Sequence, residues 1–318
     1  MQELFKAGLI AIGVCLIGGP FLIPFLSRLK FGQSVRTEGP KSHLQKAGTP
    51  TMGGLLFFFS LTIAVAFTAG FNVVTVLVLV VTIAFGGIGL LDDFIKVVLK
   101  RPLGLKAREK LLAQILVAGV FAYLLVAYGG RGTDLIIPGT PWILSLGWFY
   151  IPFVIFMMVG FNNAVNLTDG LDGLAAGVTL FAALAYLLIT NAWGLRDLSL
   201  FAAALVGTCL GFLFFNIHPA RVFMGDTGSL ALGGAVFSLA VLTKTELLFL
   251  VIGGVFVLET LSVIIQVIYF RLTGGKRFFK MSPLHHHYEL SGWSEQRVVL
   301  TFWGAAALCA CLGVVLVL

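Results

Sequence analysis

Charged residues are scarce in this sequence. Asp, Glu, Lys and Arg make up 11% of its 318 residues, whereas 59% are apolar and the mean hydropathy is +1.03. Soluble domains carry about 25% charged residues, so this composition excludes a soluble globular protein and predicts a polytopic membrane protein. Because no linker or low-complexity tract interrupts the chain, we expect a single membrane domain over residues 1–318.

Cysteine is also scarce, and all four cysteines lie inside apolar segments: Cys15, Cys209, Cys309 and Cys311. A thiol in such a place behaves as a small apolar side chain, so neither a disulfide nor a Cys-ligated metal site is expected. The first apolar segment is not followed by a small-residue cleavage site and a soluble domain, so we expect no removable signal peptide.

Long apolar runs, in contrast, are abundant. A helix needs about 20 apolar residues to cross the hydrocarbon core of a bilayer, and ten segments approach or exceed that length, which predicts an all-α fold of ten transmembrane helices. The segments are Leu4–Leu26, Met52–Ala69, Val73–Val98, Leu111–Tyr128, Phe149–Ala164, Leu174–Ile189, Leu198–Phe215, Ser229–Leu242, Leu247–Phe270 and Val298–Leu318. Those ending at Ala164 and Leu242 are short for a span, which requires a thin bilayer or longer true ends.

Lys and Arg predict the orientation, because they are retained on the cytoplasmic side. One set of alternate loops holds 17 of the 21 Lys and Arg residues: Arg28–Pro50, Lys96–Lys110, Asn162–Gly173, Asn216–Gly228 and Arg271–Arg297. We therefore expect these loops to be cytoplasmic and both termini to face outward. The net charge of +7 then reflects topology and nearness to anionic lipid and substrate, and no nucleic-acid partner is expected.

Polar residues are concentrated in one of these loops, between the fifth and sixth spans. Asn162, Asn166, Asp169 and Asp172 are spaced by four, three and three residues, so they would share one side of a continuing helix, which two glycines nearby would loosen. Carboxylates and carboxamides at a membrane boundary are typical of ion or substrate sites. The alternative is a polar turn whose carboxylates cap a helix start.

Acidic residues also flank two other spans. Asp92 and Asp93 are adjacent near a helix C-terminus, where the helix dipole and mutual repulsion disfavour them, so a cation is needed nearby. Lys96 lies one turn away, and a metal ion or substrate would complete the compensation; the alternative is a simple Asp–Lys pair. Asp226 opens the eighth span, where it would cap the helix or hold a cation beside a bound anion.

Basic and imidazole groups lie on the same side. Lys46 precedes Gly, Thr and Pro residues that would form a phosphate cradle or an ordinary helix start. All five histidines, His43, His218 and His285–His287, fall in these loops. The consecutive histidines lack the spacing of a zinc site and suit hydrogen bonding to phosphate or substrate, unless the loop is merely solvated. Glu259, inside the ninth span, is expected to pair with a group on a neighbouring helix.

These groups together indicate a reaction. Several carboxylates without Cys or ordered His ligands favour a hard ion such as Mg²⁺, and Lys with glycine-rich turns favours phosphate. The sequence therefore predicts Mg²⁺-assisted phosphoryl transfer at the cytoplasmic membrane surface. The alternative from another class is an ion-coupled transporter, which is disfavoured because the acids cluster at one boundary and no inverted repeat is visible.

Five motifs then resemble the bacterial phospho-N-acetylmuramoyl-pentapeptide transferase family, over nearly the whole chain. They are Lys46–Gly54, Leu91–Lys96, Asn163–Gly173, Phe223–Ser229 and Pro283–Trp293. The aspartate motifs alone also fit the wider polyprenyl-phosphate sugar-1-phosphate transferases, including those that use UDP-GlcNAc. The unbroken His triplet followed by Glu289 and Gly292-Trp293 resembles the muramoyl-pentapeptide branch. One departure is Leu300-Thr301, where the family commonly has Arg; Arg297 would supply that charge.

The resemblance implies the substrates and the setting. UDP-MurNAc-pentapeptide would donate phospho-MurNAc-pentapeptide to undecaprenyl phosphate, giving lipid I and UMP, with Mg²⁺ as cofactor. The protein would be a homodimer of ten-helix subunits in the bacterial plasma membrane, each subunit with a cleft facing the cytoplasm. A sister transferase that uses UDP-GlcNAc is the alternative enzyme.

The resemblance also implies residue roles. Asp226 would hold Mg²⁺, Asp92 would deprotonate or position the lipid phosphate with Asp93 beside it, and Asp169 and Asn166 would line the catalytic centre. The residues implied for the uridine pocket are Gly170, Leu171, Asp172, Asn216 and Phe223. Those implied for phosphate, donor sugar or peptide are Lys46, Thr51, Lys110, Gln266, His285, His286 and His287.

Overall fold

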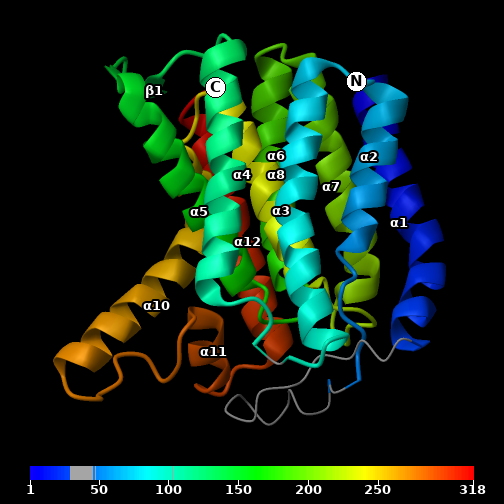
Figure 1. Cartoon of the computed structure of the whole chain (residues 1–318), viewed down its shortest axis with the longest axis vertical. Coiled ribbons are helices and arrows are strands. Elements are labelled where there is room, and N and C mark those ends of the chain that lie inside the picture. The colour runs from blue at the N-terminus through cyan, green and yellow to red at the C-terminus, as the bar shows by residue number, and fades with distance from the viewer. Residues whose placement is uncertain (29–45, 47, 102) are drawn as a thin grey trace.

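The fold is a bundle of long helices with both chain termini at one end (Figure 1). The computed structural model describes residues 1–28, 46, 48–101 and 103–318. The long helices are α1 (Gln2–Arg28), α2 (Leu55–Thr68), α3 (Val73–Val97), α4 (Ala107–Tyr128), α5 (Tyr150–Thr168), α6 (Leu174–Ala192), α7 (Arg196–Asn216), α8 (Gly225–Leu242), α10 (Gly254–Leu272) and α12 (Glu295–Val315). Nine of these begin within four residues of the start of a predicted span, and α10 begins inside the ninth, so the all-α membrane fold is confirmed.

The number of spans differs slightly from the expectation. Within the described residues, nine helices are long and apolar enough to cross a membrane. The tenth apolar helix, α2, has 14 residues, because the preceding residues Pro50, Gly53 and Gly54 form backbone hydrogen bonds with the loop before α8.

The ninth predicted span, Leu247–Phe270, is broken. A single turn, α9 (Phe249–Ile252), ends at Gly253, and α10 then leaves in a new direction and leans away from the bundle (Figure 1). Its buried residues Val255, Glu259, Ser262 and Gln266 follow one helical stripe, while side chains such as Leu258 are exposed.

The centre of the bundle is formed by α6, α7 and α8, whose membrane-spanning stretches are 72%, 89% and 83% buried. The corresponding values for α1 and α10 are 22%, so these helices lie at the periphery. Close packing of α3 on α8 relies on Gly89, because a Cβ there would come within 2.0 Å of the Asp226 carbonyl oxygen. This contact places the end of α3 beside the start of α8.

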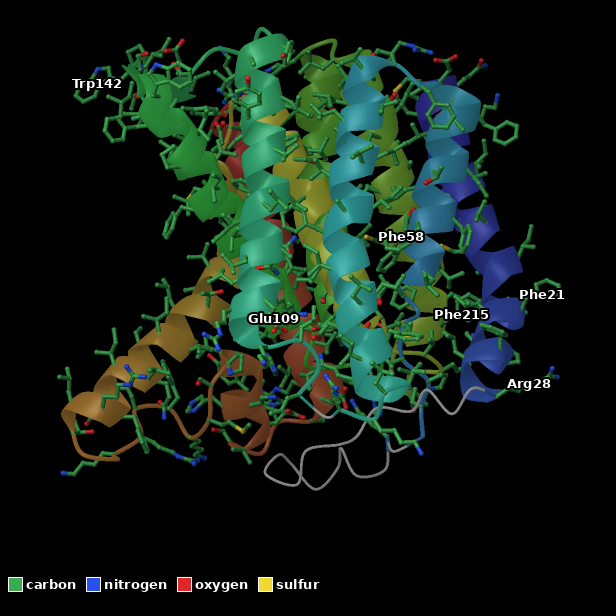
Figure 2. All side chains as sticks on the ribbon, in the orientation of Figure 1. Phe21, Arg28, Phe58, Glu109, Trp142 and Phe215 are labelled. Atoms are coloured by element: carbon green, nitrogen blue, oxygen red, sulfur yellow. The ribbon has the colours of Figure 1, made fainter. Side chains whose placement is uncertain are left out.

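The two ends of the bundle differ in character. The described loops that were predicted to be cytoplasmic lie at the end opposite the termini, where charged side chains cluster (Figure 2). The other end carries a short antiparallel hairpin, β1 (Asp134–Ile136) and β2 (Ile143–Ser145), followed by the 3₁₀ turn η2 (Gly147–Phe149). Trp142, in the loop between these strands, projects from that end in Figure 2. Which side of the membrane each end faces stays a prediction.

Candidate active site

A cluster of carboxylates and ammonium groups lies where α3, α4 and α8 meet. The Asp226 carboxylate accepts from the Lys110 ammonium at 2.6 Å and from the Lys96 ammonium at 3.0 Å, both at Oδ2. Lys96 also contacts Asp92 Oδ2 at 2.5 Å, one helical turn away on α3. The predicted compensation of Asp92 by Lys96 is therefore confirmed, and Lys96 bridges Asp92 to Asp226.

Asp93 has a different environment from its neighbour Asp92. Its carboxylate is buried and accepts from the Asp226 backbone N–H at 3.2 Å, from the Thr227 N–H at 2.9 Å and from the Thr227 hydroxyl at 2.7 Å. The first turn of a helix has free N–H groups, so Asp93 of α3 caps α8 from outside. The prediction that Asp226 itself caps this helix is therefore wrong. Its carboxylate instead contacts Lys96 and Lys110.

The Asn162 and Asn166 side chains of α5 face α8, as their spacing predicts. Asn162 is fully buried and its amide donates to the Leu230 carbonyl oxygen at 2.8 Å. One turn later, the Asn166 amide donates to Asp226 Oδ1 at 3.1 Å and to the Ser229 hydroxyl at 2.8 Å. Asn166 thereby orients the Asp226 carboxylate from the side opposite the lysines.

The chemistry of this donor set fits a hard divalent cation. Carboxylate oxygens of Asp92, Asp93 and Asp226 lie within 4.8 Å of one another. Oxygen donors without sulfur or imidazole are those that Mg²⁺ prefers. Two of the three residues, Asp92 and Asp226, also contact ammonium groups. These ammonium groups and a bound cation would together offset the negative charge of the carboxylates and of phosphate oxygens.

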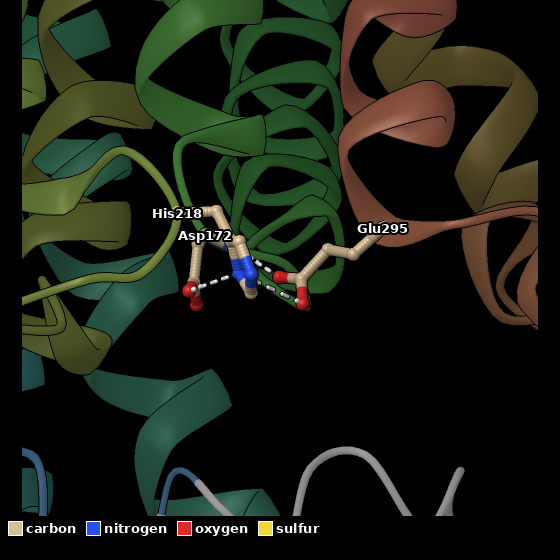
Figure 3. Close-up of side chains that lie close together, drawn as sticks. All are labelled: Asp172, His218 and Glu295. Carbon is tan, nitrogen blue, oxygen red and sulfur yellow. Dashed lines mark hydrogen bonds and ion pairs between the residues drawn. The ribbon is translucent and has the colours of Figure 1, made fainter.

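A second polar cluster joins four distant segments. Asp172 accepts from the Lys46 ammonium at 2.7 Å, and Glu295, at the start of α12, contacts the same ammonium at 2.5 Å. His218 Nδ1 lies 3.1 Å from Asp172 Oδ2 and 3.4 Å from Glu295 Oε2, as Figure 3 shows. The Ala220 N–H donates to Asp172 at 3.0 Å, so the Asp172 carboxylate has a partner on each oxygen.

The turn between α5 and α6 lies between the two clusters. The helix ends at Thr168, and Gly173 has a φ of +79°, so the loosening expected near the glycines is confirmed. The Gly173 N–H donates to the buried Asn216 side chain, whose amide donates to the Val222 carbonyl oxygen. Asn216 thus fixes this turn against the loop before α8, and the neighbouring Leu171 is buried beneath it.

Asp169 opens this turn and is influenced by both clusters. Burial raises its pKa well above the usual 3.8, and the nearby carboxylates of Asp226, Asp93 and Asp172 raise it further, while Lys46 opposes them. Among the described residues, none donates a hydrogen bond to its carboxyl group. Burial and the three carboxylates therefore make ionisation of Asp169 harder than that of an exposed carboxyl group.

Gly170 is required by a close contact with α11 (Leu284–Glu289). A Cβ on Gly170 would lie 2.2 Å from His285 Nε2. The His285 ring is fully buried and its Nδ1 lies 3.2 Å from the Glu259 carboxylate of α10. The expected pairing of Glu259 with a neighbouring helix is confirmed, and the first histidine of the triplet supports the turn that carries Asp169.

The loop from Pro50 to Gly54 packs on the loop before α8. The Phe223 N–H donates to the Pro50 carbonyl oxygen at 2.8 Å, and the Gly53 and Gly54 N–H groups donate to the Phe223 and Met224 carbonyl oxygens at 2.9 and 3.0 Å. A phosphate cradle at these two glycines is therefore wrong, because backbone oxygens take both N–H groups. Thr51, also in this loop, is buried against Gly225 and Asp93.

Three predicted substrate residues are engaged within the last polar loop. Gln266 of α10 accepts from the Phe278 and Phe279 N–H groups at 3.2 and 2.8 Å. His287 Nδ1 accepts from the Lys280 N–H at 3.1 Å, and His286 Nδ1 lies 2.9 Å from a Glu289 oxygen. Their role toward substrate stays a prediction, and His43 lies outside the described residues.

Sequence reasoning missed Glu295 as a site residue and did not assign a role to His218. Glu295 follows Ser294, whose hydroxyl accepts from the Arg297 N–H at 3.4 Å, so the local signal is that of a helix start. Its contact with Lys46 spans 249 positions, which no local pattern reveals. His218 carried one usable signal, its place in a polar loop that ends at Asp226.

Comparisons with known proteins agree with the motifs. Residues 74–244 match the model for glycosyl transferase family 4, and residues 46–58 match a phospho-N-acetylmuramoyl-pentapeptide-transferase signature. A protein of that name from Bacillus subtilis is 57% identical over 93% of this chain and 92% of its own length. A protein of the same name from Desulfitobacterium hafniense is 54% identical over 99% of this chain and 97% of its own length. Another from Halalkalibacterium halodurans is 56% identical over 95% of this chain and 94% of its own length.

Proposed function

The chain belongs to the phospho-N-acetylmuramoyl-pentapeptide transferase family and is a multi-pass membrane transferase; from this premise we propose its substrates and the roles of its residues. The donor is UDP-MurNAc-pentapeptide and the acceptor is undecaprenyl phosphate. The products are lipid I and UMP. The enzyme acts as a homodimer in the bacterial plasma membrane, with the aspartate-bearing end toward the cytoplasm.

One observation carries the reaction type. Asp226 is held by Lys96, Lys110 and Asn166 beside Asp92, at an end of the bundle where further basic residues lie. Two anionic reactants must approach one another in phosphoryl transfer, so catalysis depends on positioning and on positive charge around the phosphates. An arrangement of fixed carboxylates alternating with ammonium groups provides both.

The proposed chemical step is a direct displacement. An oxygen of the lipid phosphate attacks the phosphorus that bears MurNAc and forms a new phosphorus–oxygen bond. The bond from that phosphorus to the oxygen bridging to UMP breaks, and UMP leaves with the bonding electrons. Asp92 positions the attacking phosphate or takes its remaining proton, and Lys96 and Lys110 face the phosphoryl oxygens.

Mg²⁺ is proposed as the cofactor at Asp226, with Asp92 as the neighbouring oxygen donor. When bound, it supplies charge neutralisation of the diphosphate and of the leaving phosphate. Asp93 is the less suitable ligand, because Asp226 and Thr227 already donate three hydrogen bonds to its carboxylate. Its role is to hold Asp226 at the start of α8.

The donor nucleotide is proposed to occupy the region of the second cluster. The uridine lies against Gly170, Leu171, Asp172, Asn216 and Phe223, and Lys46 and Thr51 face its phosphates. This placement is supported by the turn that carries both Asp169 and Asp172. Lys46 donates to the Asp172 side chain of this turn, and Asn216 accepts from its Gly173 N–H. Gln266 and the His285–His287 triplet are proposed to serve the sugar and peptide.

The test is UMP release by the detergent-purified protein with undecaprenyl phosphate and Mg²⁺. UDP-MurNAc-pentapeptide is compared with UDP-GlcNAc, beside an Asp226→Asn variant and a chelator control. UMP and lipid product from the muramoyl donor alone, lost in the variant and with chelator, supports the proposal. Preference for UDP-GlcNAc would transfer the chain to the sister activity, and solute uptake into proteoliposomes without UMP release would favour a transporter.

A further inference from the structure

A cavity lies at the end of the bundle opposite the aspartates. It has a volume of about 530 Å³, within the range of small-molecule sites, and lies between the β1–β2 hairpin and the ends of α6, α8 and α12. Its walls are largely apolar, with Pro138, Leu248, Leu316 and Val317 among them. The cavity is therefore remote from the proposed reaction and has no role in it.

One cation faces this cavity. Lys244, in the turn after α8, is half-buried and lines the wall beside Thr245 and Trp193. In the part of the chain that the structure describes, no ion pair or hydrogen bond engages its ammonium group. The Asp134 carboxylate and the Lys244 ammonium both lie near Gly132, but the two side chains do not form an ion pair. The cavity thus offers an ammonium group that no described residue holds in an ion pair.

The walls are held in place by a buried network. The Arg131 guanidinium donates to the Val241 carbonyl oxygen at 2.6 Å, pairs with Glu246 and lies 4.5 Å from the Tyr150 ring centroid. It also donates to the Gly132 and Asp134 carbonyl oxygens at 3.3 Å. Since Arg131 precedes the hairpin and Glu246 follows Lys244, this network fixes the hairpin against the α8–α9 turn. Arg131 and Tyr150 both contact Glu246 Oε1, and among the described residues no ion pair joins the Glu246 carboxylate to Lys244.

The level of the cavity along the bundle indicates its occupant. It lies at the ends of three apolar helices, which is where headgroups meet hydrocarbon. Three of the five tryptophans lie at this end, Trp142, Trp148 and Trp193, and they are 70%, 80% and 40% exposed. Exposed Trp at helix ends is typical of the membrane interface.

We propose that this cavity is a binding site for one anionic phospholipid, whose phosphate contacts Lys244 and whose acyl chains lie along Leu316 and Val317. Charge complementarity selects an anionic lipid over a zwitterionic one, and the apolar walls select a lipid over a free anion. A bound lipid would connect the hairpin to the end of α12. The site lies outside the proposed reaction centre, so its lipid is not the acceptor substrate.

The test measures thermal unfolding of the full chain in detergent, titrated with phosphatidylglycerol, phosphatidylcholine or inorganic phosphate. Lys244 has a φ of +57°, so Lys244→Asn places a residue that tolerates this conformation, and the fold is preserved. Lys6→Gln, which removes an exposed cation near the N-terminus at the same end, is the matched control. Phosphatidylglycerol should stabilise the wild type and the control more than phosphatidylcholine does, and Lys244→Asn should need about fivefold more of it for the same effect.

A second measurement locates the lipid. Brominated phosphatidylglycerol should quench the part of the tryptophan fluorescence that Trp193→Phe removes, and it should do so less in Lys244→Asn. Equal phosphatidylglycerol responses in Lys244→Asn and wild type would overturn the proposal, as would the absence of a lipid preference in the wild type. Stabilisation by inorganic phosphate as large as that by the lipid would show an anion site and not a lipid site.

Discussion

Asp93 on α3 caps α8 through Thr227, whose backbone N–H and hydroxyl donate to the same carboxylate oxygen at 2.9 and 2.7 Å. Asp93 and Thr227 are 134 positions apart in the chain, yet the end of α3 lies where α8 begins. Asp92, the preceding residue, faces Lys96 instead. The adjacent residues Asp92 and Asp93 therefore have different roles, and substituting each one alone should have different effects.

Asp93→Asn should lower the stability of the folded protein, because Asp93 caps α8. The amide retains one acceptor but loses the charge that three donors share, so the unfolding free energy should fall by about 1–2 kcal/mol. Thermal unfolding in detergent measures the effect. Asp197→Asn is the control, since Asp197 lies in the first turn of α7 and contacts the Arg196 guanidinium at 3.6 Å. Equal losses for the two variants would argue against the cap.

Asp226→Asn should reduce the transfer rate by at least about 100-fold, because it removes the charge that Lys96, Lys110 and Asn166 orient. The rate of UMP release under saturating substrates measures it. Its thermal unfolding should be compared with that of the wild type, since the loss must occur in folded protein. A folded variant that retains a tenth of the rate would remove Asp226 from the centre of the proposal.

Glu295→Gln should weaken donor binding. Glu295 contacts Lys46 and His218 and accepts from the Asp172 N–H at 2.8 Å, so its loss frees three groups of the second cluster. The expected result is a KM for the nucleotide donor raised about tenfold with a smaller change in kcat. Glu109→Gln, at the exposed start of α4, is the matched control. A change in kcat alone would place Glu295 at the chemical step.

Gly170→Ala should impair activity through a clash. The new methyl group would lie 2.2 Å from His285 Nε2, so either the ring or the turn bearing Asp169 must shift. Gly160→Ala on α5 is the control, because a Cβ there meets nothing within 4 Å. In a His285→Ala background the same Gly170→Ala change should cost little. If it costs as much there as in the wild type, the contact is not the cause.

Asp169→Asn should make the protein inactive but more stable, and the gain should depend on pH. Burial and neighbouring carboxylates raise the pKa of Asp169 in the folded protein above its unfolded value of 3.8. The contribution of Asp169 to the free energy of unfolding is therefore fully present below pH 3.8, and it is lost as the pH rises through the folded pKa. The variant cannot ionise at this position. Its gain in Tm over wild type should therefore be larger at about pH 8 than at about pH 4. A gain that is constant or falls with pH would contradict the raised pKa.

Much of the fold follows from local sequence. Apolar length predicts every long helix, because a helix satisfies its own backbone in lipid and needs no distant partner to do so. The break at Gly253 was missed because both sides of it are apolar, so hydropathy runs through it without a change. The charged loops that the structure describes were correctly grouped at one end, because the Lys and Arg content of a loop can be read directly from the sequence.

The site is only partly readable from sequence. Asp92, Asn166 and Asp226 stand out because polar groups are costly at a membrane boundary, and the structure brings them together. The division of labour between Asp92 and Asp93 was not readable, since it depends on which helix each carboxylate faces. Glu295, which contacts Lys46, and His285, which lies against Gly170, both come from the last loop, and only the folded chain brings that loop to the turn.

The outward lean of α10 widens the subunit at the end opposite the termini, and at the other end α5 and the β1–β2 hairpin lean to the same side (Figure 1). Only 22% of the membrane-spanning stretch of α10 is buried, so most of this helix faces its surroundings. The tension and curvature of the surrounding bilayer then act on the angle at Gly253, so the shape of the membrane itself enters the energetics of the helix that carries Glu259 and Gln266.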